Sequence, residues 1–313
     1  MIKIRISKRA LLGRIAAARP RWLAQAKVRA RRAIVARHVN EADGTWGAIK
    51  AIFIELQHHK CAYCEAPLAK PSAGAHDAMS VDYDVDHFRP KNRVTPWPTE
   101  EVKRRRVALD YAARVRCGAR GGYVRLAFDP TNFLVACKVC NSGYKRDRFP
   151  IAGRSDTRLI GRTRLDAKER PLLLFPLGSG ADDPAKYLSF VGPIIQPRPR
   201  RGHARLRART MIDFFELDTR EDLVEARCHV LMLAWPQLEA GANERGAARA
   251  KARAFVAAMA SSRFPHAACA RAFVALHAGD RRAARRVFEA ARAYLTSRGA
   301  RVGDDNEPSH EER

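Results

Sequence analysis

The sequence lacks any segment able to cross a membrane as a helix, because no apolar run approaches the roughly 20 residues that such a helix needs. Its first residues also lack the apolar core of a secretory signal. No G-x-x-x-x-G-K-S/T motif is present, so the chain has no phosphate-binding loop for hydrolysing ATP by that route. We therefore expect a cytoplasmic protein with no membrane contact, which would need a separate ATPase for any energy-dependent step.

Acidic residues are scarce. The 313 residues contain 33 Asp and Glu against 59 Lys and Arg, a formal net charge of +26, and residues 1–40 contain no acidic residue. Such a charge favours association with a polyanion, because neutralising phosphates releases their counterions. An arginine-rich proteome is the alternative explanation. We expect a nucleic acid partner, with duplex DNA first, although charge alone does not separate DNA from RNA.

The cysteines are odd in number, seven in all, which favours metal binding over a disulfide framework in a cytoplasmic protein. Four of them form two Cys-x-x-Cys pairs that lie 72 residues apart. These pairs are Cys61 with Cys64 and Cys137 with Cys140. Four thiolates make a closed tetrahedral site of the structural kind, so we expect Zn²⁺ here. The alternative is two redox or incidental pairs.

Between the pairs, an alternating apolar and polar stretch ends in Asp86-His87 and turns at Pro90, a pattern that predicts a strand. Phosphodiester hydrolysis needs a base that takes a proton from water and a cation that neutralises charge on the phosphate. Imidazole suits the first task, which makes His87 the candidate base. The Asp86 carboxylate and the Asn141 amide oxygen are hard donors that suit Mg²⁺. By itself, an Asp-His pair is weak evidence.

The order of these motifs resembles the zinc-stapled HNH endonucleases, also called ββα-metal or His-Me finger nucleases. It runs Cys-x-x-Cys, Asp86-His87-x-x-Pro-Lys, Asn132-Phe-Leu, then Cys-x-x-Cys-Asn141. The resemblance implies that His87 is the general base and that Asp86 and Asn141 bind a catalytic Mg²⁺ or Mn²⁺. It also implies that Asn132 orients the loop and that the products carry a 5′-phosphate and a 3′-hydroxyl. The third family position is Asn here and not His, which leaves the metal preference open.

Within that family, the sequence looks most like the retron-associated and Septu-type proteins, which are bacterial anti-phage nucleases that work beside an ATPase. The resemblance covers about residues 45–228. It implies antiviral defence with an ATPase partner, for which the helices after residue 219 are either a docking surface or simply a packed cap. Two alternatives stay open: a stand-alone restriction or mobile-element nuclease, and a catalytically silent zinc-stapled adaptor that binds nucleic acid. Retention of all four site residues favours the enzyme.

Basic side chains near the site are candidates for nucleic-acid binding, either on the scissile phosphate or on the DNA backbone. They are Arg89, Lys91 and Lys145. For Lys91, an ordinary backbone contact is the preferred interpretation.

The fold class that we expect is α+β: a ββα-metal HNH finger with its four-cysteine zinc clamp, embedded in a mainly helical body and followed by a small β-hairpin. The hairpin is predicted over residues 187–195, which have Gly192-Pro193 at their middle. An amphipathic helix with Thr45 as its N-cap is predicted over residues 46–57. The predicted regions are a basic helical N-terminal region (1–60), the nuclease core with its zinc knuckles and a helical insertion (61–150), a hairpin-containing extension (151–218), an Arg/Ala-rich helical region (219–302) and a disordered tail (303–313).

Overall fold

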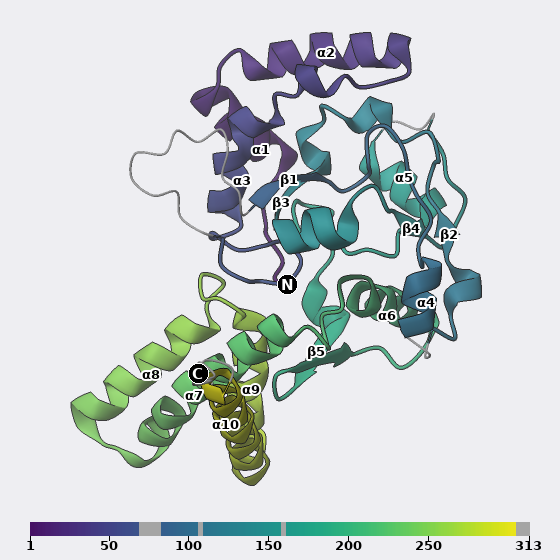
Figure 1. The fold of residues 1–313 in the computed structure, drawn as a ribbon. Helices are drawn as coiled ribbons and strands as arrows, with labels where there is room; N and C mark the ends of the chain where they lie inside the picture. The colour runs from purple at the N-terminus through teal and green to yellow at the C-terminus, as the bar shows by residue number, and fades with distance from the viewer. Residues whose placement is uncertain (69–82, 106–108, 158–160, 305–313) are drawn as a thin grey trace, which may run out of the picture. The chain divides into compact units, whose positions relative to one another are not determined.

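The computed structural model describes residues 1–68, 83–105, 109–157 and 161–304, which divide into two compact units (Figure 1). Unit 1 comprises Met1–Leu188 and Pro197–Leu217, and unit 2 comprises Ser189–Gln196 and the described residues from Asp218 onwards. Most of the predicted tail lies outside the described residues. Its first two residues, 303 and 304, still belong to a helix.

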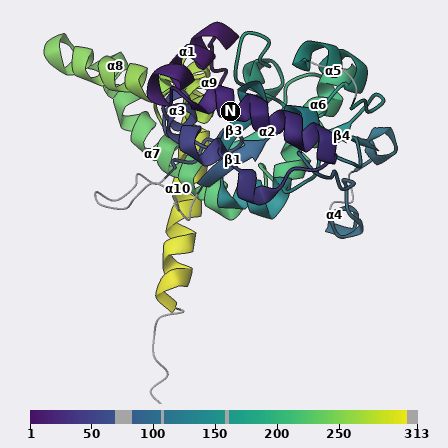
Figure 2. The same cartoon turned by 90° about the horizontal axis from the view of Figure 1, so that it is seen from above.

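Most of the regular secondary structure of unit 1 is helical. Its helices are α1 (Lys8–Ala18), α2 (Trp22–Ala36), α3 (Lys50–Leu56), α4 (Glu100–Arg105), α5 (Arg162–Glu169) and α6 (Gly202–Phe215). Helix α1 begins at a Ser7 cap, whose hydroxyl accepts from the Ala10 amide at 3.1 Å, and it buries Leu11 and Ile15, four residues apart on one face. In two perpendicular views, α3 lies beside the strands β1 (Tyr83–His87) and β3 (Phe133–Cys137), and α1 contacts α2 (Figures 1 and 2).

The predicted helix over residues 46–57 is present, but it begins as the 3₁₀ turn η2 (Trp46–Ile49) before α3. Thr45 stands before this turn, yet its hydroxyl caps nothing and has no hydrogen-bond partner. Thr45 is therefore the N-cap residue by position, as predicted, but its side chain makes no capping hydrogen bond. Thr45 uses its carbonyl instead, which accepts from the Trp22 indole at 2.7 Å and joins η2 to α2.

An antiparallel pair of strands, β1 (Tyr83–His87) and β3 (Phe133–Cys137), forms the centre of unit 1. Their register places Tyr83 opposite Cys137 and His87 opposite Phe133. Both strands are largely buried, and α3 packs on β3. A seven-residue π-helical segment, η7 (Val139–Lys145), follows β3 and contacts both strands. The predicted strand up to His87 is thus confirmed over the residues that the structure describes.

A long excursion separates β1 from β3. It contains α4 and, after it, η4 (Ala112–Arg114), β2 (Arg116–Cys117), η5 (Val124–Leu126) and η6 (Pro130–Asn132). Strand β2 pairs with β4 (Pro150–Ile151), which follows η7. The predicted hairpin is also present, as the pair β5 (Leu188–Val191) and β6 (Ile194–Pro197) with Gly192-Pro193 between them.

Unit 2 contains four long helices after the hairpin residues. They are α7 (Glu221–Asn243), α8 (Gly246–Ala260), α9 (Ala267–Gly279) and α10 (Arg281–Asp304). Their shared core contains Leu231, Phe273 and Ala284, with the Trp235 ring stacked on Phe288 at 5.2 Å. Across the described part of the chain, we find no helix with the length and apolarity that crossing a bilayer requires.

Two leucines on α7 provide a test of this core. Leu231 has no exposed surface, whereas 52% of Leu233 is exposed. We expect Leu231→Ala to lower the free energy of unfolding by about 2–5 kcal/mol, because it removes buried methyl groups and leaves a cavity. Leu233→Ala should change it by no more than about 0.5 kcal/mol. Urea unfolding followed by circular dichroism measures both, and equal losses would mean that α7 does not pack as described.

Candidate functional site

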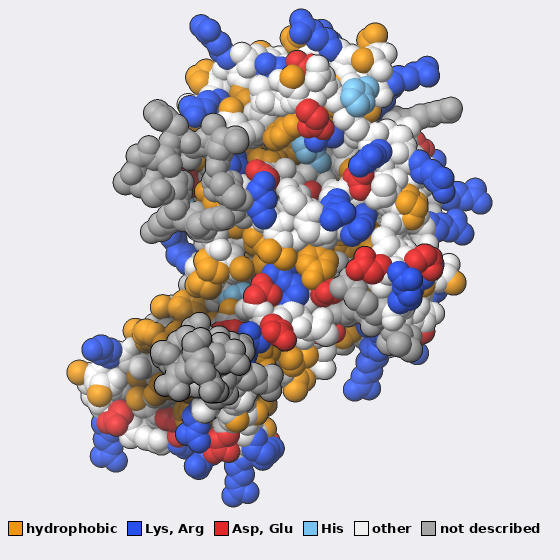
Figure 3. Space-filling view, viewed as in Figure 1, with side chains coloured by type: hydrophobic (Ala, Val, Ile, Leu, Met, Phe, Trp, Pro, Cys, Tyr) orange, Lys and Arg blue, Asp and Glu red, His pale blue; other side chains and the backbone are white. Residues whose placement is uncertain are grey.

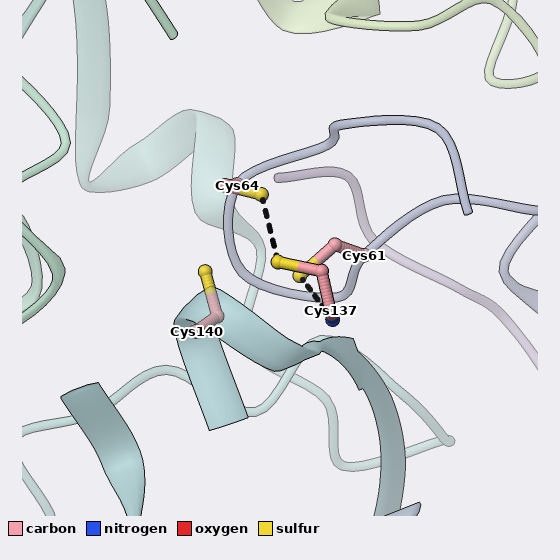
Figure 4. Close-up of side chains that lie close together, drawn as sticks. All are labelled: Cys61, Cys64, Cys137 and Cys140. Atoms are coloured by element: carbon pink, nitrogen blue, oxygen red, sulfur yellow. Dashed lines mark hydrogen bonds between the residues drawn. The ribbon is translucent and has the colours of Figure 1, made fainter. Parts of the chain in front are cut away.

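Four cysteines converge at one end of β3 (Figure 4). Cys61 and Cys64 lie in the turns after α3, Cys137 ends β3, and Cys140 lies in η7. Their sulfur atoms all lie within 4.8 Å of one another, and none is in a disulfide. The Sγ atoms of Cys64 and Cys137 are 3.9 Å apart, close to the roughly 3.8 Å edge of a tetrahedron with Zn–S bonds of about 2.3 Å. This cluster could hold a metal such as zinc, and the predicted grouping is confirmed.

A buried glutamine explains how pairs so distant in sequence meet. Gln57 follows α3, and its amide pairs with the backbone of β3 as a strand neighbour would: Val135 donates to Oε1 at 2.8 Å and accepts from Nε2 at 2.7 Å. The same Nε2 donates to the Lys60 carbonyl at 3.0 Å, and the Ala62 amide also donates to Val135. We call this set of bonds the Gln57 joint. It fixes the first cysteine pair against the strand that carries the second.

His87 ends β1 with its ring almost fully buried, edge-on to Trp46 and Phe133 at 4.9 Å each. Its Nε2 lies 2.9 Å from the Ala127 carbonyl oxygen, which can only accept, so Nε2 carries the hydrogen and Nδ1 keeps its lone pair. Burial, and next to it the Lys91 charge, lowers the pKa of His87 to about 3. The imidazole is therefore neutral at neutral pH.

Asp86 is buried beside His87. One of its carboxylate oxygens accepts a short hydrogen bond from the Tyr63 hydroxyl, and the other lies 3.6 Å from the Lys145 ammonium. Lys145 also donates to the His87 carbonyl at 3.2 Å. Burial, together with the Asp86 charge, raises the pKa of Tyr63 far above its usual value, so this hydroxyl remains a donor. The first cysteine turn, which contains Tyr63, therefore orients the carboxylate of β1.

One cleft of ≈ 1210 Å³ brings the predicted metal ligands and base together. Asp86 and His87 from β1 line it with Asn141 from η7, and so do the basic residues Lys91 and Arg146. A π-helical turn widens the backbone relative to an α-helix and occurs often at functional sites. The Asn141 side chain is partly exposed, and the carboxylate and amide oxygens are donors of the kind that a hard cation prefers.

Asn132 is buried and does not line the cleft. Its Oδ1 accepts from the Arg89 amide at 2.9 Å, and its Nδ2 donates to the Arg89 carbonyl at 3.0 Å and to the Leu126 carbonyl at 3.3 Å. These bonds pin the backbone two residues after His87. The geometry is what loop positioning requires, and that role remains a proposal for Asn132.

Two of the three expected nucleic-acid contacts need correction. The Arg89 side chain is 1% exposed. Its guanidinium nitrogens form ion pairs with carboxylate oxygens of Glu169 at 2.8 Å and of Asp166 at 2.7 Å. Lys145 is 0% exposed. A phosphate cannot reach either charge in this conformation, so we withdraw both contacts. Lys91 lines the cleft, 3.2 Å from Glu41 and over the Trp46 ring, and its predicted backbone contact stays a prediction.

The sequence reading missed Tyr63, Trp46 and the acidic partners of Arg89. The role of Tyr63 could have been predicted, because a tyrosine between two cysteines of the cluster is expected to be buried, and a buried hydroxyl needs a hydrogen-bond partner. Glu169 and Asp166 had none, since they come from α5, about 80 residues further along the chain.

No family model matches the chain. No solved structure matches it either. The chain is similar to the Septu protein PtuB of Bacillus mycoides, with 26% identity over 143 residues. The match covers 46% of this chain and 38% of that protein, so the chain spans well under half of its relative's length. This similarity agrees with the Septu part of the resemblance, while the HNH assignment stays a prediction.

The cysteine cluster predicts one zinc ion per chain. Cys61→Ser should abolish zinc binding and unfold the first cysteine turn, because structural metal binding contributes folding free energy. Cys117→Ser is the matched control, since Cys117 lies outside the cluster and is partly exposed. Zinc in the purified proteins is measured by mass spectrometry. A Cys61→Ser protein that kept one zinc would remove Cys61 from the ligand set.

The Arg89 ion pair predicts a large stability effect at Glu169, which has no exposed surface. Glu169→Ala leaves a buried guanidinium short of a partner and should lower the free energy of unfolding by about 3–5 kcal/mol. The neighbouring Lys168 forms a surface pair with Asp156, and Lys168→Ala should cost at most about 1 kcal/mol. Denaturant unfolding compares them. Similar small losses would show that the buried pair is not formed in solution.

Proposed function

We propose that this protein is a metal-dependent HNH endonuclease that hydrolyses DNA phosphodiester bonds, with β1, β3 and η7 as its ββα-metal finger. The observation that carries the proposal is the cleft: a neutral imidazole with an available Nδ1, a carboxylate and an amide oxygen line one opening. In a chain of net charge +26, this opening suits a polyanionic substrate.

His87 acts as the general base in this proposal. The Ala127 carbonyl holds its ring by Nε2, which leaves Nδ1 to take the proton of an attacking water. The low pKa of His87 keeps Nδ1 unprotonated, but it also makes the imidazole a weak base. A cation bound nearby would raise the acidity of the attacking water and so ease this transfer.

Asp86 and Asn141 would hold that cation, Mg²⁺ or Mn²⁺. The residues fit it, because carboxylate and amide oxygens are the donors that such a cation prefers, both side chains line the cleft, and the cleft leaves room for several waters. When bound, the cation neutralises charge on the phosphoryl and leaving oxygens. Cleavage would leave a 5′-phosphate and a 3′-hydroxyl, as the family resemblance implies.

The biological setting that we propose is bacterial anti-phage defence, beside a separate ATPase subunit. Its support is the similarity to the Septu protein PtuB, together with the motifs that resemble Septu-type nucleases.

Plasmid cleavage tests the nuclease proposal. His87→Ala should reduce metal-dependent nicking or linearisation by about 100-fold or more, the contribution of a positioned base. His38→Ala is the matched control, because His38 lines the same cleft but is exposed. Cleavage should require added Mg²⁺ or Mn²⁺ while zinc content stays constant.

Equal activity of the two histidine variants would remove His87 as the base. If the wild-type protein bound DNA but never cut it, even with the ATPase subunit present, the nuclease proposal would fail and a silent adaptor would replace it.

A further inference from the structure

A second set of basic side chains in unit 1, separate from the cleft, lines two adjoining hollows of ≈ 380 and ≈ 210 Å³. The hollows share Arg114, Gly202 and Leu206 in their walls, so they lie next to each other. We call them together the arginine groove. Its basic residues are Arg114, Arg116, Arg170, Arg201, His203, Arg205 and Arg209. Lys and Arg side chains gather over the edge of unit 1 where β2 lies (Figure 3).

The positive charge of the groove is mostly uncompensated. Asp110 is the carboxylate among its lining residues, and it lies 3.9 Å from Arg209, which also pairs with Asp213 at 3.6 Å. Within the described ranges, the other five arginines have no carboxylate within ion-pair distance. Four of these five are exposed: Arg114, Arg116, Arg170 and Arg201. The buried Arg89 differs from them, because its charge is compensated by ion pairs with Asp166 and Glu169.

His203 adds an unsatisfied polar atom. Its Nδ1 is buried and has no hydrogen-bond partner. Burial, and next to it the Arg170 charge, lowers the pKa of His203 to about 4, so the ring is neutral at neutral pH. A buried nitrogen without a partner is costly. Because this atom has almost no exposed surface, we assign no ligand contact to it, and His203 contributes a neutral side chain to the wall of the groove.

The groove and the cleft are close neighbours along the chain. Arg148 lines the cleft and Ala152 lines the groove, with strand β4 between them. Four residues of extended chain span at most about 14 Å. A DNA strand advances about 3.4 Å per phosphate along the helix axis, so a single duplex of several base pairs covers that distance.

We propose that the arginine groove binds the phosphate backbone of the duplex DNA whose neighbouring segment occupies the cleft. Guanidinium groups recognise phosphate with paired hydrogen bonds, and a row of uncompensated guanidiniums matches the regular charge of a nucleic acid strand. This inference extends the proposed function by naming a surface that holds the substrate. It concerns binding and not chemistry, so the two proposals can fail separately.

Fluorescence anisotropy with a labelled DNA duplex, without added Mg²⁺, tests the groove. The triple variant Arg114→Gln/Arg116→Gln/Arg170→Gln should raise Kd by about tenfold or more at moderate salt. It should also flatten the dependence of log Kd on log salt by about two to three, since each phosphate contact contributes about 0.9 to that slope. The matched control is Arg245→Gln/Arg282→Gln/Arg286→Gln, which removes the same charge from exposed arginines of unit 2. Its slope should stay unchanged.

A single variant separates binding from folding. Arg170 has φ 50°, in the left-handed region that favours glycine at a helix end. Arg170→Gly therefore removes the guanidinium without straining the backbone, and it should weaken binding severalfold while the melting temperature holds.

Three results would overturn the inference. The first is an equal loss of affinity in both triple variants, which would mean that net charge alone governs binding, and the second is no loss of affinity in the groove variant. The third is displacement of DNA by polyglutamate that depends on the groove arginines, which would mean that the groove binds an acidic protein. If no condition yields cleavage but groove-dependent binding persists, the nuclease proposal fails and this inference stands.

Discussion

The Gln57 joint is the contact on which the rest of the candidate site depends. A single buried amide replaces a missing strand neighbour for Val135 and so fixes the end of α3 against β3. That attachment brings the first cysteine turn to the second, and with it Tyr63 to the carboxylate of Asp86. A metal held by the four thiolates would reinforce the same attachment, because its binding free energy adds to folding. The cysteine cluster and the cleft are thus structurally linked, because the turn that contains Cys61 and Cys64 also orients the Asp86 carboxylate through Tyr63.

A second set of contacts holds the segment that follows His87. Asn132 pins the Arg89 backbone, while the Arg89 side chain reaches Glu169 and Asp166 of α5. A buried ion pair of this kind is weak evidence for stability, because desolvation offsets much of the Coulomb attraction. It does impose geometry, since a guanidinium with two fixed carboxylates can occupy few positions. The segment after His87 is consequently held by its backbone and by its side chain at once.

Much of this arrangement followed from local pattern. The Cys-x-x-Cys spacing predicted the cluster, the alternation before His87 predicted a strand, and Gly192-Pro193 predicted the hairpin. The sequence could not predict which residues distant along the chain would contact one another. Nothing local marks Glu169 as the partner of Arg89, and nothing distinguishes the π-helical turn of η7 from an α-helix. Thr45 shows the converse: it has the residue type of an N-cap, yet a 3₁₀ turn and the Trp22 indole use its carbonyl instead.

The basic residues show why proximity in sequence misleads about charge. Arg89 and Lys145 lie within a few residues of His87 and Asn141, and both are buried beside carboxylates that consume their charge. A cation buried at these positions could not be left without a partner, because an unpaired buried charge is far more costly than a paired one. The charge available to a polyanion must then lie where no carboxylate competes for it. In unit 1 the arginine groove meets that condition, since it is assembled from η4, β2, the end of α5 and the start of α6, and these segments are distant in sequence.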